Sequence, residues 1–130
     1  MERSGGRETI FILDDNVISI MTTEDVLLQN GYEVVKMSSA SGLVAKLEYA
    51  RPDVMLLDPT LPRLDIDATL DEIRASTELS NLAIVLYCDL EANETYEIAR
   101  QHRLDGYFCK SLEVSKLPQY IDQLFDESPS

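Results

Sequence analysis

The sequence predicts an α/β domain in which a five-stranded parallel sheet is doubly wound, with helices on both faces. Two observations predict this class. Short apolar runs alternate five times with segments of helical pattern along the 130 residues, and residues 53–58 are apolar without alternation, as expected of a strand covered on both faces. Strands that alternate with helices form right-handed βαβ units, and five such units most often give the strand order 2-1-3-4-5.

The first strand and helix follow the polar N-terminal segment. Residues 9–14 are predicted to be a buried strand. Asp15 and Asn16 then offer side-chain oxygens that cap a helix, and Asn30-Gly31 is typical of a helix end. The helix has an apolar stripe at helical spacing, made of Val17, Ile20, Met21, Leu27 and Leu28.

The second and third strands follow the same plan. Residues 33–37 form a short strand, and residues 38–41 supply capping side chains for the next helix. That helix carries the apolar residues Leu43, Val44, Leu47 and Ala50. Arg51-Pro52 ends the helix, because a residue before proline avoids the helical conformation. Residues 53–58 are then the third strand.

The remaining elements complete the alternation. The two prolines in residues 59–62 predict a turn, and residues 65–76 predict an amphipathic helix. Its inward side chains are Ala68, Leu70 and Ile73. We then expect a strand at 82–87, a helix at 91–102, a strand at 106–109 and a helix at 113–125. The chain divides into a flexible N-terminus at 1–8, one domain at 9–126, and a tail or the start of a linker at 127–130.

Composition limits the function. The formal net charge is −13, so the phosphates of nucleic acid would be repelled, which argues against direct binding. No apolar run approaches the roughly 20 residues of a membrane helix, and residues 11–13 are too short for a signal-peptide core. We therefore expect a cytoplasmic protein without membrane contact. Cys88 and Cys109 are expected to be reduced, buried thiols, with a disulfide between them as the alternative.

Charged residues stand at the carboxyl ends of three of the predicted strands. The first strand ends in Asp14-Asp15, the third in Asp58 and the fifth in Lys110. The carboxyl ends of parallel strands meet at one edge of a sheet, and the expected order places the first and third strands side by side. Carboxylates this close repel one another unless a cation joins them. We therefore predict that this edge binds Mg²⁺ and a phosphoryl group.

Four segments, in order and each at a strand end, resemble the receiver domain of the response regulators of two-component signalling systems. They are Ile12-Leu13-Asp14-Asp15, Arg51-Pro52-Asp53-Val54-Met55-Leu56-Leu57-Asp58, Leu61-Pro62-Arg63-Leu64-Asp65 and Asp105-Gly106-Tyr107-Phe108-Cys109-Lys110. The resemblance covers residues 8–126. It implies the flavodoxin-like receiver fold.

The resemblance also implies roles for individual residues. Asp58 would be the phosphoacceptor, with a histidine kinase or a phosphotransfer protein as the donor. Asp15 and Asp58 would bind Mg²⁺ directly with the main-chain carbonyl of Thr60, and Asp14 would act through a water. Lys110 would pair with the acceptor carboxylate and then with the phosphoryl oxygens. The domain would be no enzyme beyond self-catalysed phosphorylation and dephosphorylation. It would signal through its fourth helix, fifth strand and fifth helix, as a monomer or a phosphorylation-dependent dimer.

The chain departs from the family pattern around the residues that switch. Cys88 stands where the family usually has a Ser or Thr hydroxyl, and Asp89 follows where a small residue usually lets phosphate approach. Ser111 replaces a proline, and Ile66 replaces a glycine. Tyr107 matches the aromatic residue whose rotamer reports activation, with an ordinary half-buried strand tyrosine as the alternative. We therefore expect metal binding and phosphorylation with atypical switching.

Three other functions compete with this one. A pseudo-receiver would be fixed in one state and would recruit a partner without phosphate. The fold also binds flavin mononucleotide, but the loop Asp14-Asp15-Asn16 lacks the small and hydroxyl residues that a flavin phosphate needs. An aspartyl phosphatase would carry a second acid two residues after Asp58, where Thr60 stands.

Overall fold

The computed structural model describes residues 8–110, 112 and 114–126. Its centre is a five-stranded sheet in the order β2-β1-β3-β4-β5, in which every pair of neighbouring strands is parallel. The strands are β1 (Thr9–Leu13), β2 (Glu33–Met37), β3 (Val54–Leu57), β4 (Ala83–Cys88) and β5 (Gly106–Cys109). The predicted fold class and strand order are confirmed.

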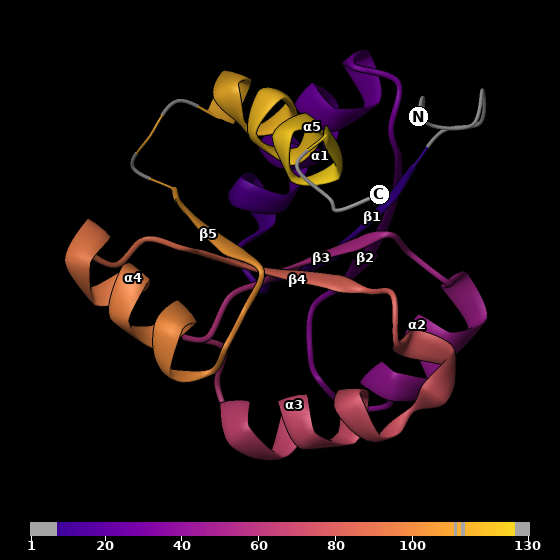
Figure 1. The fold of residues 1–130 in the computed structure, drawn as a ribbon. Helices are drawn as coiled ribbons and strands as arrows, with labels where there is room; N and C mark the ends of the chain where they lie inside the picture. The colour runs from indigo at the N-terminus through magenta and orange to yellow at the C-terminus, as the bar shows by residue number, and fades with distance from the viewer. Residues whose placement is uncertain (1–7, 111, 113, 127–130) are drawn as a thin grey trace.

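Helices cover both faces of the sheet. They are α1 (Val17–Gln29), α2 (Leu43–Ala50), α3 (Ile66–Ala75), α4 (Ala92–Gln101) and α5 (Leu117–Asp126). Figure 1 shows α1 and α5 on one face, and α2, α3 and α4 on the other. Two short 3₁₀ turns, η1 (Thr77–Leu79) and η2 (Val114–Lys116), precede β4 and α5. In the described part of the chain, no helix has the length and apolar character that crossing a membrane requires.

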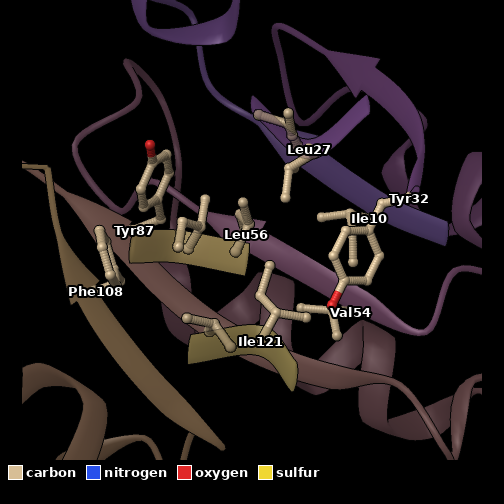
Figure 2. Packing of buried hydrophobic residues seen from close by; sticks show 11 residues of the cluster. Ile10, Leu27, Tyr32, Val54, Leu56, Tyr87, Phe108 and Ile121 are labelled. Atoms are coloured by element: carbon tan, nitrogen blue, oxygen red, sulfur yellow. The ribbon is translucent and has the colours of Figure 1, made fainter. Parts of the chain in front are cut away.

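Two hydrophobic cores result, because side chains along a strand point alternately to the two faces. In β1, Ile10 and Ile12 join the core beneath α1 and α5, whereas Phe11 and Leu13 join the core beneath α2 and α3. Figure 2 shows the first of these cores, where Ile121 of α5 packs toward the strands. Every residue of β3 is buried, which explains the lack of alternation in its sequence.

The buried face of helix α1 differs from the predicted apolar stripe. Leu27 is fully buried, but Val17 is 67% exposed, Met21 62% and Leu28 52%. The face that packs on the sheet instead includes Thr23, which is only 1% exposed. The stripe misled because apolar residues lie on more than one side of this helix, so spacing alone did not identify the buried face.

Three smaller predictions about helices are wrong. Residues 38–41 do not cap α2, because Gly42 occupies the N-cap position in a left-handed conformation and makes no side-chain bond. In α3, Ala68 is exposed and the neighbouring Thr69 is buried instead. Helix α5 begins at Leu117, because η2 occupies the turn before it.

The predicted domain boundaries remain a prediction. Residues 1–7 and 127–130 lie outside the described residues, so neither the flexible N-terminus nor the tail or linker is tested. Within the described residues, regular structure runs from Thr9 to Asp126.

Candidate functional site

The strand ends position the three charged residues that follow them. β1 and β3 run side by side in register up to their last residues. The backbone N–H of Asp14, of Asp58 and of Lys110 each donates to a carbonyl of a neighbouring strand, at 3.1, 3.1 and 2.7 Å. The ladder therefore continues for one residue beyond each strand and fixes the direction in which each charged side chain leaves the sheet.

Lys110 lies between two carboxylates. Its Nζ donates to Oδ2 of Asp14 at 2.5 Å and to Oδ2 of Asp58 at 3.0 Å. The side chain of Lys110 is 14% exposed, and those of the two acids are almost fully buried. Burial alone would lower the pKa of Lys110, but the hydrogen bonds to Asp14 and Asp58 and their charges outweigh it and raise that pKa. Lys110 is therefore a cation at neutral pH and offsets the negative charge of both acids.

Asp14 is held by the start of α1 as well as by the lysine. Its Oδ1 accepts from the backbone N–H of Asn16 at 3.0 Å, and its Oδ2 accepts from Oγ of Ser19 at 3.0 Å. A carboxylate offers about four lone pairs, and with Lys110 three of them have protein donors. Asp14 is therefore fixed in place and retains one acceptor position that no described donor fills.

Asp58 is fixed by the turn that follows β3. Its Oδ1 accepts from the backbone N–H of Thr60 at 2.9 Å and from Oγ1 of Thr60 at 2.6 Å. Its Oδ2 accepts from Lys110 only, among the described residues. The carboxylate is thus oriented on one oxygen by a tight turn, and the other oxygen keeps a free lone pair.

A cleft of about 640 Å³ opens beside these residues. Asp15, Asp58, Asp89, Thr60 and Lys110 all line it. Asp15 and Asp89 are exposed, and neither has a hydrogen-bond or ion-pair partner among the described residues. The predicted capping role of Asp15 is wrong, because Asn16 alone caps α1 by accepting from the backbone N–H of Ser19. Asp15 is therefore available to a ligand in the cleft.

The donor set of the cleft fits a hard divalent cation. The carboxylates of Asp15 and Asp58 are oxygen ligands, and the main-chain carbonyl of Thr60 accepts no hydrogen bond within the described residues. Mg²⁺ is usually held by one or two carboxylates and keeps several waters. No group of three or more acidic, histidine or cysteine side chains in the described part of the chain is arranged to hold a metal. A site here would therefore need the carbonyl and waters beside two carboxylates.

Cys88, at the position of the usual switch hydroxyl, points toward α4. It is fully buried, and its Sγ lies 3.8 Å from Oγ1 of Thr95. That hydroxyl donates to the carbonyl of Glu91 at 2.8 Å. Burial raises the pKa of the Cys88 thiol, so the thiol is neutral at physiological pH. Cys88 and Cys109 are both free and buried.

Tyr107 lies on β5 against α4 and α5. Its ring meets the ring of Tyr96 edge-on, with centroids 5.8 Å apart. Its backbone N–H donates to the hydroxyl of Tyr120 at 3.0 Å. Tyr107 is half-buried, and its ring contact with Tyr96 connects the fifth strand to the fourth helix. Of the other departures from the family pattern, Ile66 is the first residue of α3, and Ser111 lies outside the described residues.

Sequence reasoning missed three residues of the site. Ser19 holds Asp14, and Tyr87 lines the cleft while its hydroxyl contacts Thr23. A residue three positions after a helix N-cap lies in the first turn of the helix. The spacing of Asn16 and Ser19 could therefore have placed Ser19 near Asp14. Nothing in the sequence pattern identified Tyr87, because a tyrosine within an apolar strand is usually a core residue.

The fold and the cleft define a class of α/β domain with acids and a lysine at the carboxyl edge of the sheet. The sequence matches the response regulator receiver domain family over residues 10–122. The chain therefore belongs to the receiver domain family, and the resemblance predicted from its motifs is confirmed.

Individual relatives are distant but of nearly the same length. The chemotaxis protein CheY of Bacillus subtilis is 26% identical over 116 residues, which is 88% of this chain and 94% of that protein. The polar-differentiation response regulator DivK of Brucella ovis is 25% identical over 120 residues, or 90% of this chain and 93% of that protein.

A solved structure supports the fold. The receiver domain of the sensor histidine kinase PA1611 from Pseudomonas aeruginosa superposes with a TM-score of 0.80 at 23% sequence identity, covering 94% of this chain and 100% of that one. That structure holds a magnesium ion coordinated in its active-site cleft. At this level of identity the likeness shows a shared fold.

Proposed function

We propose that this receiver domain accepts a phosphoryl group on Asp58 with the help of Mg²⁺, and signals through contacts with other proteins. The observation that carries the proposal is the position of Asp58. It is a carboxylate oriented by Thr60, paired with the Lys110 cation, and open on one oxygen to a cleft with further oxygen donors. A histidine kinase or a phosphotransfer protein is the expected donor, and the cytoplasm is the expected location.

The chain's own residues have distinct parts in this reaction. A carboxylate oxygen of Asp58 forms the new bond to phosphorus, and the bond from phosphorus to the donor's imidazole nitrogen breaks. Phosphoryl transfer depends mostly on positioning and on neutralising charge. Lys110 already contacts Asp58 at 3.0 Å, so it supplies a cation for the oxygens of the incoming group. The turn at Thr60 holds the acceptor still.

Asp15, Asp58 and the Thr60 carbonyl would hold Mg²⁺. The ion would supply positive charge to the phosphoryl oxygens. The need for it follows from the charges that line the cleft, because three carboxylates face one lysine there. Asp89 adds one carboxylate to the usual family pattern, so phosphorylation should be slower here than with a small residue at that position.

We infer that switching is atypical. Family members usually grip the phosphoryl group with a hydroxyl at the end of β4, whereas Cys88 offers a weak thiol donor that already faces Thr95 on α4. The downstream partner is expected on the surface formed by α4, β5 and α5, where Tyr96 is 47% exposed beside Tyr107. Without the switch hydroxyl, we expect smaller changes on that surface after phosphorylation.

The donor protein is expected to dock on α1. Three side chains of that helix, Val17, Ile18 and Met21, are more than 60% exposed. Ile18 also lines the cleft next to Asp58. An apolar surface beside an acceptor residue suits a partner that must place its own reactive group in the cleft.

Intact mass after incubation with acetyl phosphate and Mg²⁺ tests the proposal. The wild type should gain one phosphoryl group, and Asp58→Asn should not. Asp89→Asn, which changes an exposed acid of the same cleft, is the matched control and should gain the group faster than the wild type. A wild type that gains no mass, with Mg²⁺ present, contradicts the proposal.

A second candidate is a pseudo-receiver that binds its partner without phosphorylation. The observation in its favour is the pair Cys88 and Asp89, because the first lacks a strong donor and the second repels phosphate. Loss of both the mass gain and Mg²⁺ binding, with partner binding retained, would favour it.

A further inference from the structure

Tyr87 joins the cleft to the core beneath α1 and α5. It is the second-last residue of β4 and only 3% exposed. Its ring packs beside Phe108, with centroids 6.0 Å apart, and Figure 2 shows the two rings side by side at the margin of that core. The residue also lines the cleft with Asp58 and Lys110. One side chain therefore contacts both the hydrophobic core and the candidate site.

The hydroxyl of Tyr87 fixes the ring to α1. It lies 2.6 Å from Oγ1 of Thr23, and either group can be the donor. Thr23 is 1% exposed, so this is a buried bond between a strand and a helix. Burial raises the pKa of Tyr87, which keeps the phenol neutral and available as a hydrogen-bonding group. The ring therefore has a defined position along the edge of the cleft.

The face of the same ring lies under the lysine. Nζ of Lys110 is 5.3 Å from the centroid of the Tyr87 ring. An aromatic face attracts a cation within about 6 Å, and more strongly where water is excluded. The carboxylates of Asp14 and Asp58 hold the same ammonium group by hydrogen bonds. The lysine is thus held by two acids and an aromatic ring.

We propose that Tyr87 is a positioning residue for the phosphoacceptor site, whose ring holds the Lys110 ammonium toward Asp58 and whose hydroxyl, bonded to Thr23, fixes that ring. The proposal rests on the proposed function for its effect on phosphoryl transfer. The contact itself does not depend on that reaction. Loss of the ring would leave Lys110 with more freedom to turn away from Asp58 toward solvent.

NMR of the wild type tests the contact directly, without Mg²⁺ or a phosphoryl donor. The chain has lysines at positions 36, 46, 110 and 116 only, which makes assignment simple. The ε-methylene protons of Lys110 should be shifted upfield by the ring and should show nuclear Overhauser effects to it. Resonances of Lys110 at ordinary lysine positions, with no such effects, would overturn the proposal.

Four variants separate the ring from the hydroxyl. Tyr87→Leu removes the ring, whereas Tyr87→Phe and Thr23→Val keep the ring and remove its hydrogen bond. Tyr49→Leu is the control, since Tyr49 is 88% exposed on α2. The rate of phosphorylation by acetyl phosphate at saturating Mg²⁺ should fall about fivefold in Tyr87→Leu. It should fall less in Tyr87→Phe and Thr23→Val, and not at all in the control.

Mg²⁺ affinity distinguishes positioning from general damage. Lys110 is no Mg²⁺ ligand in the proposed site, so all four variants should bind the ion as the wild type does. If the phosphorylation rate falls equally in Tyr87→Phe and Tyr87→Leu, the role of the ring is overturned. A wild-type phosphorylation rate in folded Tyr87→Leu would overturn the whole proposal. If Tyr87→Leu fails to fold, the NMR spectrum of the wild type and the phosphorylation rates of Tyr87→Phe and Thr23→Val still test the proposal. A wild type that is never phosphorylated contradicts the proposed function, while the NMR contact remains a separate result.

Discussion

Lys110 is the residue on which the electrostatics of the site depend. It is the cation that contacts both Asp14 and Asp58, at 2.5 and 3.0 Å. Removing one member of a buried ionic cluster leaves the others desolvated and without compensation. The substitution Lys110→Ala should therefore lower the free energy of unfolding by about 3 kcal/mol, measured by urea denaturation.

The matched control is Lys46→Ala, because Lys46 is exposed on α2. That variant should stay within about 0.5 kcal/mol of the wild type. Equal stability of both variants would mean that Lys110 is solvated in solution and does not neutralise the two acids.

Cys88 predicts how stability changes in alkali. Burial raises the pKa of its thiol above the ordinary 9.0 of an exposed cysteine. Above about pH 9 the unfolded chain has lost a proton that the folded chain keeps, so the free energy of unfolding falls as pH rises. Below that pH both the folded and the unfolded chain keep the thiol proton, so the contribution of Cys88 to stability does not change with pH. Urea denaturation between pH 7 and pH 10 should show this fall in the wild type and a shallower one in Cys88→Ala.

The variant Cys109→Ala controls for the cavity that either substitution leaves in the buried strands. It should lower stability without removing the contribution of Cys88 to the pH dependence. A pH dependence of Cys88→Ala that matches the wild type would contradict this account of the thiol.

At the scale of elements, β5 and α5 meet at a glycine. A Cβ at Gly106 would collide with the hydroxyl of Tyr120, which accepts a hydrogen bond from the backbone N–H of Tyr107. Gly106→Ala should displace that hydroxyl and leave the N–H without its partner, at a cost of about 1–3 kcal/mol. Thermal unfolding measures the loss, and Gly106→Ala combined with Tyr120→Phe should lose little more than Tyr120→Phe alone. Additive losses would show that the two groups do not meet.

The proposed docking of the phosphoryl donor on helix α1 can be tested at Met21. Met21 is 62% exposed and does not line the cleft beside Asp58. A charge there should disturb docking of a protein donor without touching the chemistry, so Met21→Glu should slow transfer from a phosphotransfer protein about tenfold. Its rate with acetyl phosphate should be unchanged.

Tyr49→Glu is the control for Met21→Glu, because Tyr49 is an exposed apolar residue on α2, in the opposite layer. It should transfer at the wild-type rate from both donors. A loss of rate with acetyl phosphate in Met21→Glu would place the effect in the site itself rather than in docking.

For the whole molecule, the fold could be predicted because its signals are local and repeated. Each strand is a short apolar run, and the chain order then fixes the sheet order by general rules of connection. The meeting of Asp14, Asp58 and Lys110 followed from that order alone, because each directly follows a strand. The backbone of the sheet sets the position of such residues.

Other features depend on packing that no local pattern encodes. The buried face of α1 was misjudged because apolar residues lie on more than one side of the helix, and because the buried Thr23 contacts the hydroxyl of Tyr87 on β4. The start of α5 was instead a local signal that was missed, because Pro118 fits only the first turn of a helix, and α5 begins at Leu117. The place of Tyr87 in the site was not predictable, because the contact of its ring with Lys110 depends on the side-chain conformations of two neighbouring strands.

Asp58 should become covalently phosphorylated in this cleft. Borohydride reduces an aspartyl phosphate to homoserine, so treatment after incubation with acetyl phosphate and Mg²⁺ marks the acceptor permanently. Tandem mass spectrometry of the digested protein should then find homoserine in place of aspartate at position 58, and only when Mg²⁺ was present. Homoserine at position 15 or 89 instead, or at no position, would contradict the account.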